Sequence, residues 1–218
     1  MSVEALLQAA GDGTRLELGP KAFVVLGGKP LVTRAVQTLL EVTDRVIVAA
    51  PRAEIERTKA LIDNKNVTVI QGGTSRSETT RLLVAAATAP WLVLHDVVHP
   101  FVTRELIQSV LEAAYECGAS APAMPNSEFL YSRSGDLLHA PGEVFVGQKP
   151  VAFKRDAINE GYQLAESSPN HGDPSLLQIL ALAGVRTKFV DGSARNIKIT
   201  TAADLDFANA LVALERYQ

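Results

Sequence analysis

Short apolar runs alternate with helical patterns along the chain, and this alternation limits the possible folds more than any other feature. The apolar runs of the first half cover residues 3–8, 45–50, 67–70 and 91–96. Helical patterns occupy residues 30–40, 51–62, 77–87 and 103–117. Strands that alternate with helices are typical of a mostly parallel sheet with helices on both faces. The sequence therefore predicts an α/β fold, a Rossmann-like three-layer sandwich.

The alternation fails between about residues 126 and 149. Val144–Val146 resembles a strand there, but turn-like residues surround it. Helical patterns return near 155–166 and 175–182, a strand-like run follows at 185–190, and a helix begins at Thr201. Long irregular insertions in compact domains are usually functional or serve as interaction arms. We therefore expect one domain over residues 1–218, with a projecting β-arm at about 126–149.

Composition excludes several classes of protein. The net charge of the 218 residues is -3, so we expect no nucleic-acid partner, and any anion must bind in a local pocket. The single cysteine excludes a disulfide framework and a zinc cluster, and a lone thiol fits a reducing cytoplasm. No signal-peptide pattern and no long apolar run are found, so we expect a cytoplasmic protein without a membrane partner.

The segment after the first apolar run has the character of an anion site. Small residues and glycines follow Gln8, and two cations come soon afterwards, at Arg15 and Lys21. Small residues let the backbone approach a ligand, and free N–H groups in such a turn form a concavity for anions. Two cations beside it indicate a highly charged anion such as a triphosphate. The alternative is an ordinary strand-to-helix turn with two surface cations. Neither a dinucleotide fingerprint nor a Walker loop fits the segment.

Further candidates lie where the predicted strands end, because ligands of open parallel sheets bind at the carboxyl ends of strands. Asp96 ends a buried run, and beside a triphosphate its carboxylate would suit Mg²⁺; its alternative role is to cap the next turn. His95 is interpreted as a structural neighbour. Lys198 stands between Ile197 and Ile199, so its side chain points away from theirs in extended backbone, into the crevice or simply to solvent.

Five pieces of the chain together resemble the polyol-phosphate cytidylyltransferase family, and within it the branch acting on 2-C-methyl-D-erythritol 4-phosphate. In order, they are residues 9–16, residues 19–23, Gly72-Gly73 with Arg76, His95-Asp96 with Pro100, and residues 196–200. The resemblance covers essentially the whole length. It implies CMP transfer from CTP to the acceptor phosphate with release of pyrophosphate, as a step of non-mevalonate isoprenoid synthesis.

The resemblance also implies a role for each matching residue. Arg15, Lys21 and Lys198 would be catalytic cations, with Lys198 also touching the acceptor, and Asp96 would hold Mg²⁺ or another divalent cation. The nucleotide would meet the loop and turn residues Ala9, Ala10, Gly11, Asp12, Gly13, Gly72, Gly73 and Thr79. Such a site works by positioning and fixed positive charge, without a protein nucleophile. The family's projecting arm joins two subunits, so a homodimer through the arm is expected.

The departures from the family gather on the acceptor side. His99, Glu128-Phe129, Pro141, Lys149-Pro150-Val151 and Gly172-Asp173 stand where the family usually has other residues. Phe129 and Pro141 cannot bind a phosphate through their side chains. One interpretation keeps the acceptor unchanged, with His99, Lys149 or Arg133 as substitute cations. The alternatives are another polyol phosphate such as ribitol 5-phosphate, or a catalytically degenerate nucleotide-binding homologue.

Overall fold

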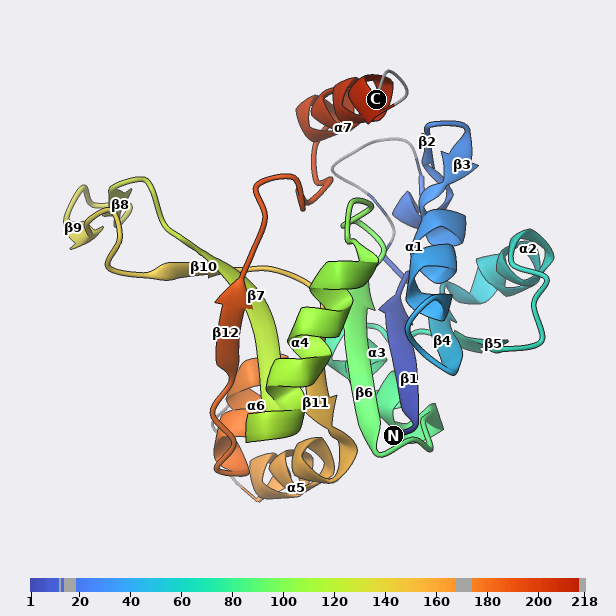
Figure 1. Ribbon diagram of the computed structural model, residues 1–218, viewed down its shortest axis with the longest axis horizontal. Helices are drawn as coiled ribbons and strands as arrows, with labels where there is room; N and C mark the ends of the chain where they lie inside the picture. The colour runs from blue at the N-terminus through green and yellow to red at the C-terminus, as the bar shows by residue number, and fades with distance from the viewer. Residues whose placement is uncertain (12, 14–18, 168–173, 216–218) are drawn as a thin grey trace.

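The computed structural model describes residues 1–11, 13, 19–167 and 174–215. Its centre is an eight-stranded sheet with the order β10-β7-β11-β6-β1-β4-β5, and β12 pairs with β7 (Figure 1). The strands of this sheet are β1 Val3–Gln8, β4 Arg45–Ala50, β5 Val67–Gln71, β6 Trp91–Asp96, β7 Ala119–Pro125, β10 Phe145–Gly147, β11 Val151–Lys154 and β12 Lys188–Asp191. Pairing among β6, β1, β4 and β5 is parallel, whereas β11 runs antiparallel to both β6 and β7.

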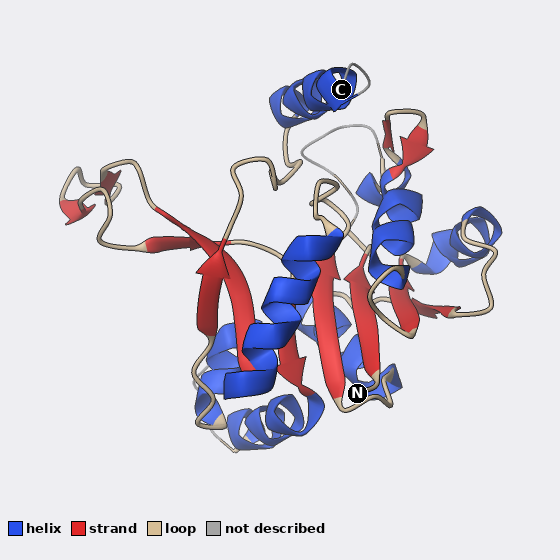
Figure 2. Cartoon of the chain, in the orientation of Figure 1, coloured by secondary structure: helices blue, strands red, loops and turns tan. Residues whose placement is uncertain are grey.

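Helices cover both faces of this sheet (Figure 2). The longer ones are α1 Leu31–Leu40, α2 Ile55–Leu61, α3 Arg76–Ala86, α4 Arg104–Cys117, α5 Arg155–Glu166, α6 Leu176–Leu182 and α7 Ala202–Glu215. Short helical turns lie at η1 Lys21–Phe23 and η2 Arg52–Glu54. Two apolar cores result, one under α1 and α4 and the other under α3, α5 and α6. The predicted α/β three-layer fold is confirmed.

Alternation along the strands explains how one sheet serves two cores. In β1, the side chains of Ala5 and Leu7 pack into the first core, whereas that of Leu6 packs into the second. Successive side chains of a strand point to opposite faces, so a strand buried on both faces is mostly apolar. This accounts for the apolar runs of β1, β4 and β6, whose predicted bounds are confirmed; the buried Glu4 of β1 is the exception, and it is paired with Arg45 of β4.

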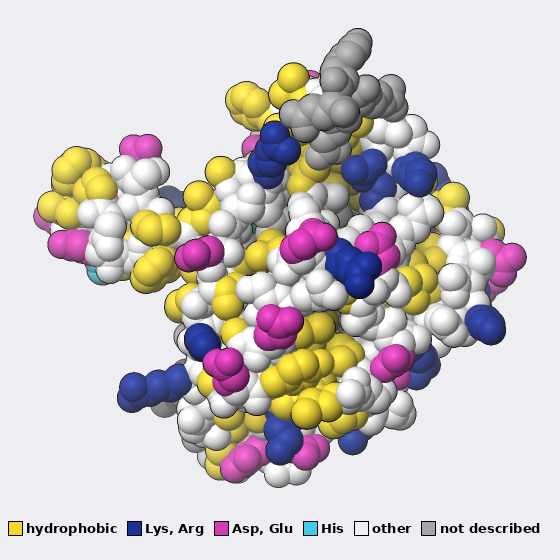
Figure 3. All heavy atoms as spheres, in the orientation of Figure 1, with side chains coloured by type: hydrophobic (Ala, Val, Ile, Leu, Met, Phe, Trp, Pro, Cys, Tyr) yellow, Lys and Arg dark blue, Asp and Glu magenta, His cyan; other side chains and the backbone are white. Residues whose placement is uncertain are grey.

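The predicted arm projects from the β7–β10 edge of the sheet (Figure 1). A two-stranded hairpin, β8 Leu130–Tyr131 and β9 Leu137–His139, lies at its tip. Its exposed apolar side chains, together with two on β10, are Phe129, Leu130, Tyr131, Leu137, Leu138, Phe145 and Val146. Figure 3 shows apolar atoms gathered on this projection. A second small pair, β2 Val25–Leu26 with β3 Lys29–Pro30, precedes α1.

Two strands of the sheet, β7 and β11, were not predicted. The segment around Lys198, expected as a short extended piece, belongs to no strand of the sheet, and the Ile199 amide donates to the Val98 carbonyl. In the described part of the chain, no helix has the length and apolar character needed to cross a membrane.

Candidate functional site

The site forms where β1, β4, β5 and β6 end side by side. The last residue of β1, Gln8, is in register with Asp96 at the end of β6 and with Ala49 near the end of β4. The amide of Ala9 continues this pairing by donating to the Ala49 carbonyl at 3.0 Å. The loops that leave these strands therefore start from fixed backbone, at the edge of the sheet where ligands of such folds bind.

The predicted nucleotide segments touch each other. Gly72 donates its amide to the Ala50 carbonyl at 2.8 Å, and its backbone lies against the methyl group of Ala10. A Cβ added to Gly72 would lie less than 3.0 Å from the Ala10 Cβ, a separation that real Cβ atoms almost never show. Glycine at 72 is thus required for the two loops to approach.

Thr79 fixes the second of these segments from the first turn of α3. Its Oγ1 accepts a hydrogen bond from the amide of Gly73 at 3.0 Å and donates to the carbonyl of Ser75 at 2.8 Å. Ser75 caps α3 by accepting from the Glu78 amide. Thr79 is buried, so in this structure its hydroxyl shapes the turn.

Lys21 joins the N-terminal loop to the C-terminal segment of the site. Its Nζ donates to the carbonyls of Ile199 and Thr200, both at 3.3 Å. Gly13, with a φ of 68°, lies against Gly19 and the Lys21 side chain. Of the predicted residues nearby, Asp12 and Arg15 lie outside the described residues. Lys21 and the 197–200 segment, far apart in sequence, are therefore brought together.

Asp96 is the central carboxylate of the site. Its side chain is 9% exposed, and Oδ2 accepts a 2.6 Å hydrogen bond from Arg76. The Nζ of Lys149 stands 4.0 Å from the other oxygen, Oδ1, which is buried and has no hydrogen-bond partner among the described residues. Burial alone would raise the pKa of Asp96, but the charges of Lys149 and Arg76 outweigh it and hold that pKa below its usual value. Asp96 is therefore ionised at neutral pH.

Arg76 was given no role by the sequence analysis, although it belongs to one of the matching pieces. Besides its ion pair with Asp96, its Nε donates to the side-chain oxygen of Gln8 at 3.2 Å. Gln8 in turn donates to the Arg76 carbonyl and to Thr80. These bonds tie the start of α3 to the ends of β1 and β6.

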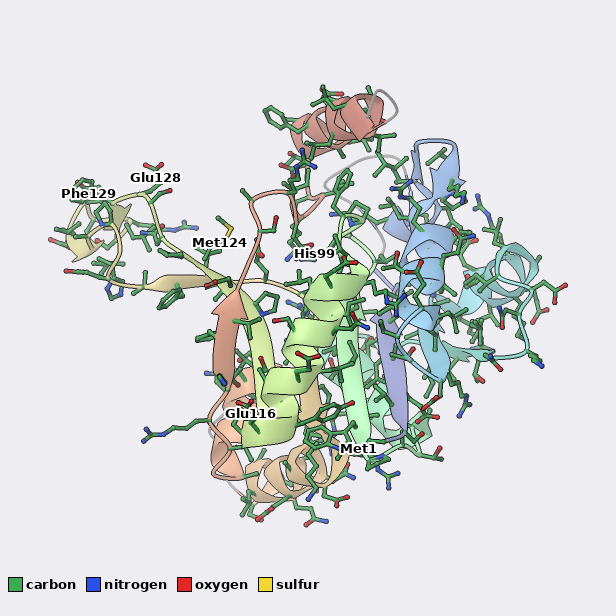
Figure 4. The ribbon with its side chains drawn as sticks, viewed as in Figure 1. Met1, His99, Glu116, Met124, Glu128 and Phe129 are labelled. Atoms are coloured by element: carbon green, nitrogen blue, oxygen red, sulfur yellow. The ribbon has the colours of Figure 1, made fainter. Side chains whose placement is uncertain are left out.

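The two histidines of the site are buried and uncharged at neutral pH. Burial lowers the pKa of His95 to about 3 and that of His99 to about 4. The Nε2 of His95 is 3.1 Å from the His99 carbonyl, which fits the structural role predicted for it. His99 lies beyond the end of β6, with Nδ1 3.4 Å from the Asn196 carbonyl (Figure 4). The expected role of His99, contact with an acceptor as a substitute for the usual cation, stays a prediction.

The segment 193–199 of the site is held by side-chain and backbone hydrogen bonds. The amide group of Asn196 donates to the Lys149 carbonyl at 2.6 Å, and Ile199 donates its backbone amide to Val98 at 2.8 Å. Gln148 and Ser193 bond to each other in both directions. Ile199 is fully buried and Lys198 is exposed, as their alternation predicted.

A cleft of about 460 Å³ opens beside Asp96 and the 194–198 segment. Its charged lining residues are Arg76, Asp96, Lys149, Lys198 and Asp204. His99, Met124 and residues 146–148, 194, 196 and 197 complete the wall. The cleft thus unites three of the predicted residues, Asp96, His99 and Lys198. No group of three or more His, Cys, Asp or Glu side chains gathers for a metal within the described ranges.

Comparisons with known proteins point to one family along nearly the whole chain. A family model described as IspD, 2-C-methyl-D-erythritol 4-phosphate cytidylyltransferase, matches residues 3–214. A protein of that name from Deinococcus radiodurans is 35% identical over 211 residues, which cover 95% of this chain and 88% of that protein. Another, from Thermus thermophilus, is 32% identical over 214 residues and 97% of each chain.

Solved structures give the same result for the fold. The crystal structure of 2-C-methyl-D-erythritol 4-phosphate cytidylyltransferase from Thermus thermophilus has a TM-score of 0.82 at 29% identity, covering 98% of this chain and 100% of that chain. The structure of 4-diphosphocytidyl-2C-methyl-D-erythritolsynthase from Anaerococcus prevotii has a TM-score of 0.84 at 24% identity, covering 97% of this chain and 98% of that chain, which supports the fold alone.

Proposed function

The chain belongs to the 2-C-methyl-D-erythritol 4-phosphate cytidylyltransferase family, and from that premise we propose that it transfers CMP from CTP to 2-C-methyl-D-erythritol 4-phosphate. Pyrophosphate is released, and the product serves the non-mevalonate synthesis of isoprenoid precursors. The observation that carries the proposal is the charged cleft at the ends of the strands, which Arg76, Asp96 and Lys198 line. It is supported by the bond from Lys21 to Ile199, next to Lys198, and by the close packing of the Ala10 and Gly72 loops.

The reaction needs positive charge more than it needs a base. An oxygen of the acceptor phosphate attacks the α-phosphorus of CTP, a new P–O bond forms, and the bond to the β-phosphate oxygen breaks. The leaving pyrophosphate keeps the electron pair. A phosphate monoester is largely dianionic at neutral pH, so no side chain has to remove a proton from it. This agrees with a site whose histidines are buried and weakly basic.

The nucleotide half is proposed to act mainly through its backbone. Ala9, Ala10 and Gly11 with Gly72 and Gly73 would hold the base and ribose, since their small side chains leave amides and carbonyls within reach. Lys21 and Arg15 would hold the triphosphate. Lys21 already bonds to two carbonyls that precede α7, so its ammonium is positioned before a ligand arrives.

The residues present fit a divalent cation. Oδ1 of Asp96 is a buried carboxylate oxygen without a hydrogen bond in the described part of the chain, and a metal ion would satisfy it. Mg²⁺ favours one or two carboxylates together with phosphate oxygens and water, so a full protein cage is not needed. When bound, the ion would neutralise charge on the phosphates, while Asp96 is the residue that would hold it.

The proposal also includes the oligomeric state, the domain organisation and the cellular location expected from the sequence. The apolar arm is proposed to bind a second copy of the chain, which gives a homodimer and covers its exposed side chains. The chain is proposed to work as one nucleotidyltransferase domain in the cytoplasm.

The test measures pyrophosphate release from CTP and Mg²⁺, with and without methylerythritol phosphate. Release that requires the acceptor and disappears in Lys21→Ala supports the proposal. Release only with another acceptor, such as ribitol 5-phosphate, would mean that the chain catalyses the same CMP transfer to a different polyol phosphate. Binding of CTP without release for any polyol phosphate would identify a catalytically degenerate homologue instead.

A further inference from the structure

Lys149 occupies a position that the sheet itself fixes. It precedes β11, which pairs antiparallel with β6 so that Val151 lies opposite Leu94. Continued by two residues, this register brings Lys149 opposite Asp96, and the observed Nζ–Oδ1 distance is 4.0 Å. The backbone carbonyl of Lys149 is held by Asn196. The backbone of Lys149 is therefore fixed, and its charged end lies beside Asp96.

The N–H donors of the Lys149 ammonium group have no hydrogen-bond acceptor among the described residues. Its side chain is only 12% exposed, and a lysine ammonium carries three N–H donors. Within the described residues no hydrogen bond from this Nζ is found, and 4.0 Å to Asp96 is too long for one. Buried cations are costly unless paired and hydrogen-bonded. An anion in the cleft would supply the missing acceptors.

Charges around the cleft also favour an anion. Three cations, Arg76, Lys149 and Lys198, line it with two carboxylates, Asp96 and Asp204. The Asp204 carboxylate is occupied by the backbone amides of residues 200 and 201, and Asp96 takes its hydrogen bond from Arg76. The charged residues that line the cleft therefore carry one positive charge in excess.

We propose that Lys149 binds the phosphate group of the acceptor, together with Lys198 and from the same chain. This inference rests on the proposed function. It identifies Lys149 as the cation that takes the place of the acceptor-binding residues that the family usually has where this chain has Phe129 and Pro141. Phe129 is exposed on the arm and has no donor for a phosphate, and Pro141 has none either. Arg133, the cation between β8 and β9, would have to come from a second copy of the chain.

The test compares Lys149→Met with two matched variants. Lys154→Met removes an exposed lysine from the other end of the same strand, and Arg133→Met removes the cation of the arm. For each, we would measure the KM for methylerythritol phosphate, the KM for CTP, and calorimetric binding of methylerythritol phosphate. A charge-assisted hydrogen bond contributes roughly 1.5–3 kcal/mol, equivalent to about a ten- to hundredfold change in affinity.

The expected result is loss of acceptor affinity by this factor in Lys149→Met alone, with the KM for CTP changed less than about threefold. Lys149→Arg, which keeps the charge, should recover part of the loss. Equal acceptor binding by wild type and Lys149→Met overturns the inference, and so does a loss found only in Arg133→Met. Wild type that binds methylerythritol phosphate but does not turn it over refutes the proposed function, while the binding series still decides the role of Lys149. Unchanged thermal stabilisation by CTP serves as the folding control, because a misfolded variant would lose it.

Discussion

Gly72→Ala tests whether the nucleotide half depends on close approach of two backbones. The added methyl would lie less than 3.0 Å from the Ala10 Cβ, whereas ordinary contact is 3.4–4 Å. The two loops must then separate by about 1 Å, since such a contact is strongly repulsive. Overpacking of this kind costs about 1–3 kcal/mol of stability, and a misplacement of about 1 Å at an active site can cost about a hundredfold in rate.

The structure also indicates a second substitution that should compensate for Gly72→Ala. The other near neighbours of the added methyl, Thr79 Oγ1 at 3.5 Å and the Ala50 carbonyl at 3.6 Å, are at ordinary distances. Removing the Ala10 methyl in an Ala10→Gly/Gly72→Ala double variant should therefore relieve the overlap. Gly11→Ala is the stability control, because its added Cβ would meet nothing within 4 Å.

The assay is urea unfolding of the single and double variants, with kcat/KM for CTP measured alongside. In stability, we expect Gly72→Ala to be destabilised, Gly11→Ala to be nearly unchanged, and the double variant to regain at least about 1 kcal/mol beyond additivity. A Gly72→Ala protein as stable and as active as wild type would refute the steric argument. So would a double variant whose losses simply add.

Three further predictions concern other parts of the molecule. Lys21→Ala should lower kcat/KM about 10²–10³-fold in steady-state assays, because it removes a preorganised cation; a change below about threefold would contradict this. Glu4→Gln should cost about 1–3 kcal/mol at pH 7, since this buried carboxylate accepts from two backbone amides and Arg45. Burial would raise the pKa of Glu4, but these hydrogen bonds hold it below its ordinary 4.5, so its stabilisation is present above that pH and is lost on acidification. Unfolding curves across pH should therefore show a steeper acid loss for wild type than for Glu4→Gln. Finally, if the proposed dimer forms through the arm, Leu137→Asp/Leu138→Asp should shift it to monomer in analytical ultracentrifugation, because both side chains are exposed apolar groups on the arm; equal sedimentation of wild type and variant would contradict the proposal.

The strands that carry the site could be read from the sequence because each is buried on both faces. Val3–Gln8, Arg45–Ala50 and Trp91–Asp96 are mostly apolar, with Glu4 and Arg45 as charged exceptions near their starts, and the structure gives the same bounds. The orientation of Lys198 followed from the same alternation. In these segments the local sequence pattern and the burial in the folded chain favour the same secondary structure, so tertiary contacts did not change the predicted elements.

Strands β7 and β11 could not be predicted because their sequences lack a strand signal. Ala119–Pro125 consists of alanine, serine, methionine and two prolines, and proline normally argues against a central strand. It is nevertheless paired with β10, β11 and β12, and its alanines at 119, 121 and 123 are buried. Small side chains are needed on this strand because helices pack closely against it. This need for small residues arises only when the layers are assembled, so it leaves no local strand signal. Strand β11 has four residues, too few for a periodic pattern.

Contacts of the acceptor side depend on pairing between segments far apart in the chain. Lys149 reaches Asp96 only because β11 pairs with β6, and no local pattern fixes the register of two such distant strands. The same holds for Arg76, whose ion pair with Asp96 spans β5, α3 and β6. Sequence analysis found these side chains in its motifs and departures, but it could not determine which of them meet.

The two halves of the site should therefore differ in how they tolerate substitution. In the proposed nucleotide half, two backbone segments pack closely, and a methyl group added at Gly72 would overlap the Ala10 side chain. The proposed acceptor half consists of residues that line an open cleft, 148–149, 194 and 196–198, with hydrogen bonds from the side chains of Gln148 and Asn196. Exchanging a charge there changes what the cleft attracts without moving the backbone. Substitutions at Lys149 and Lys198 should then alter acceptor affinity at nearly constant CTP affinity, whereas substitutions at Ala10 and Gly72 should impair CTP binding first.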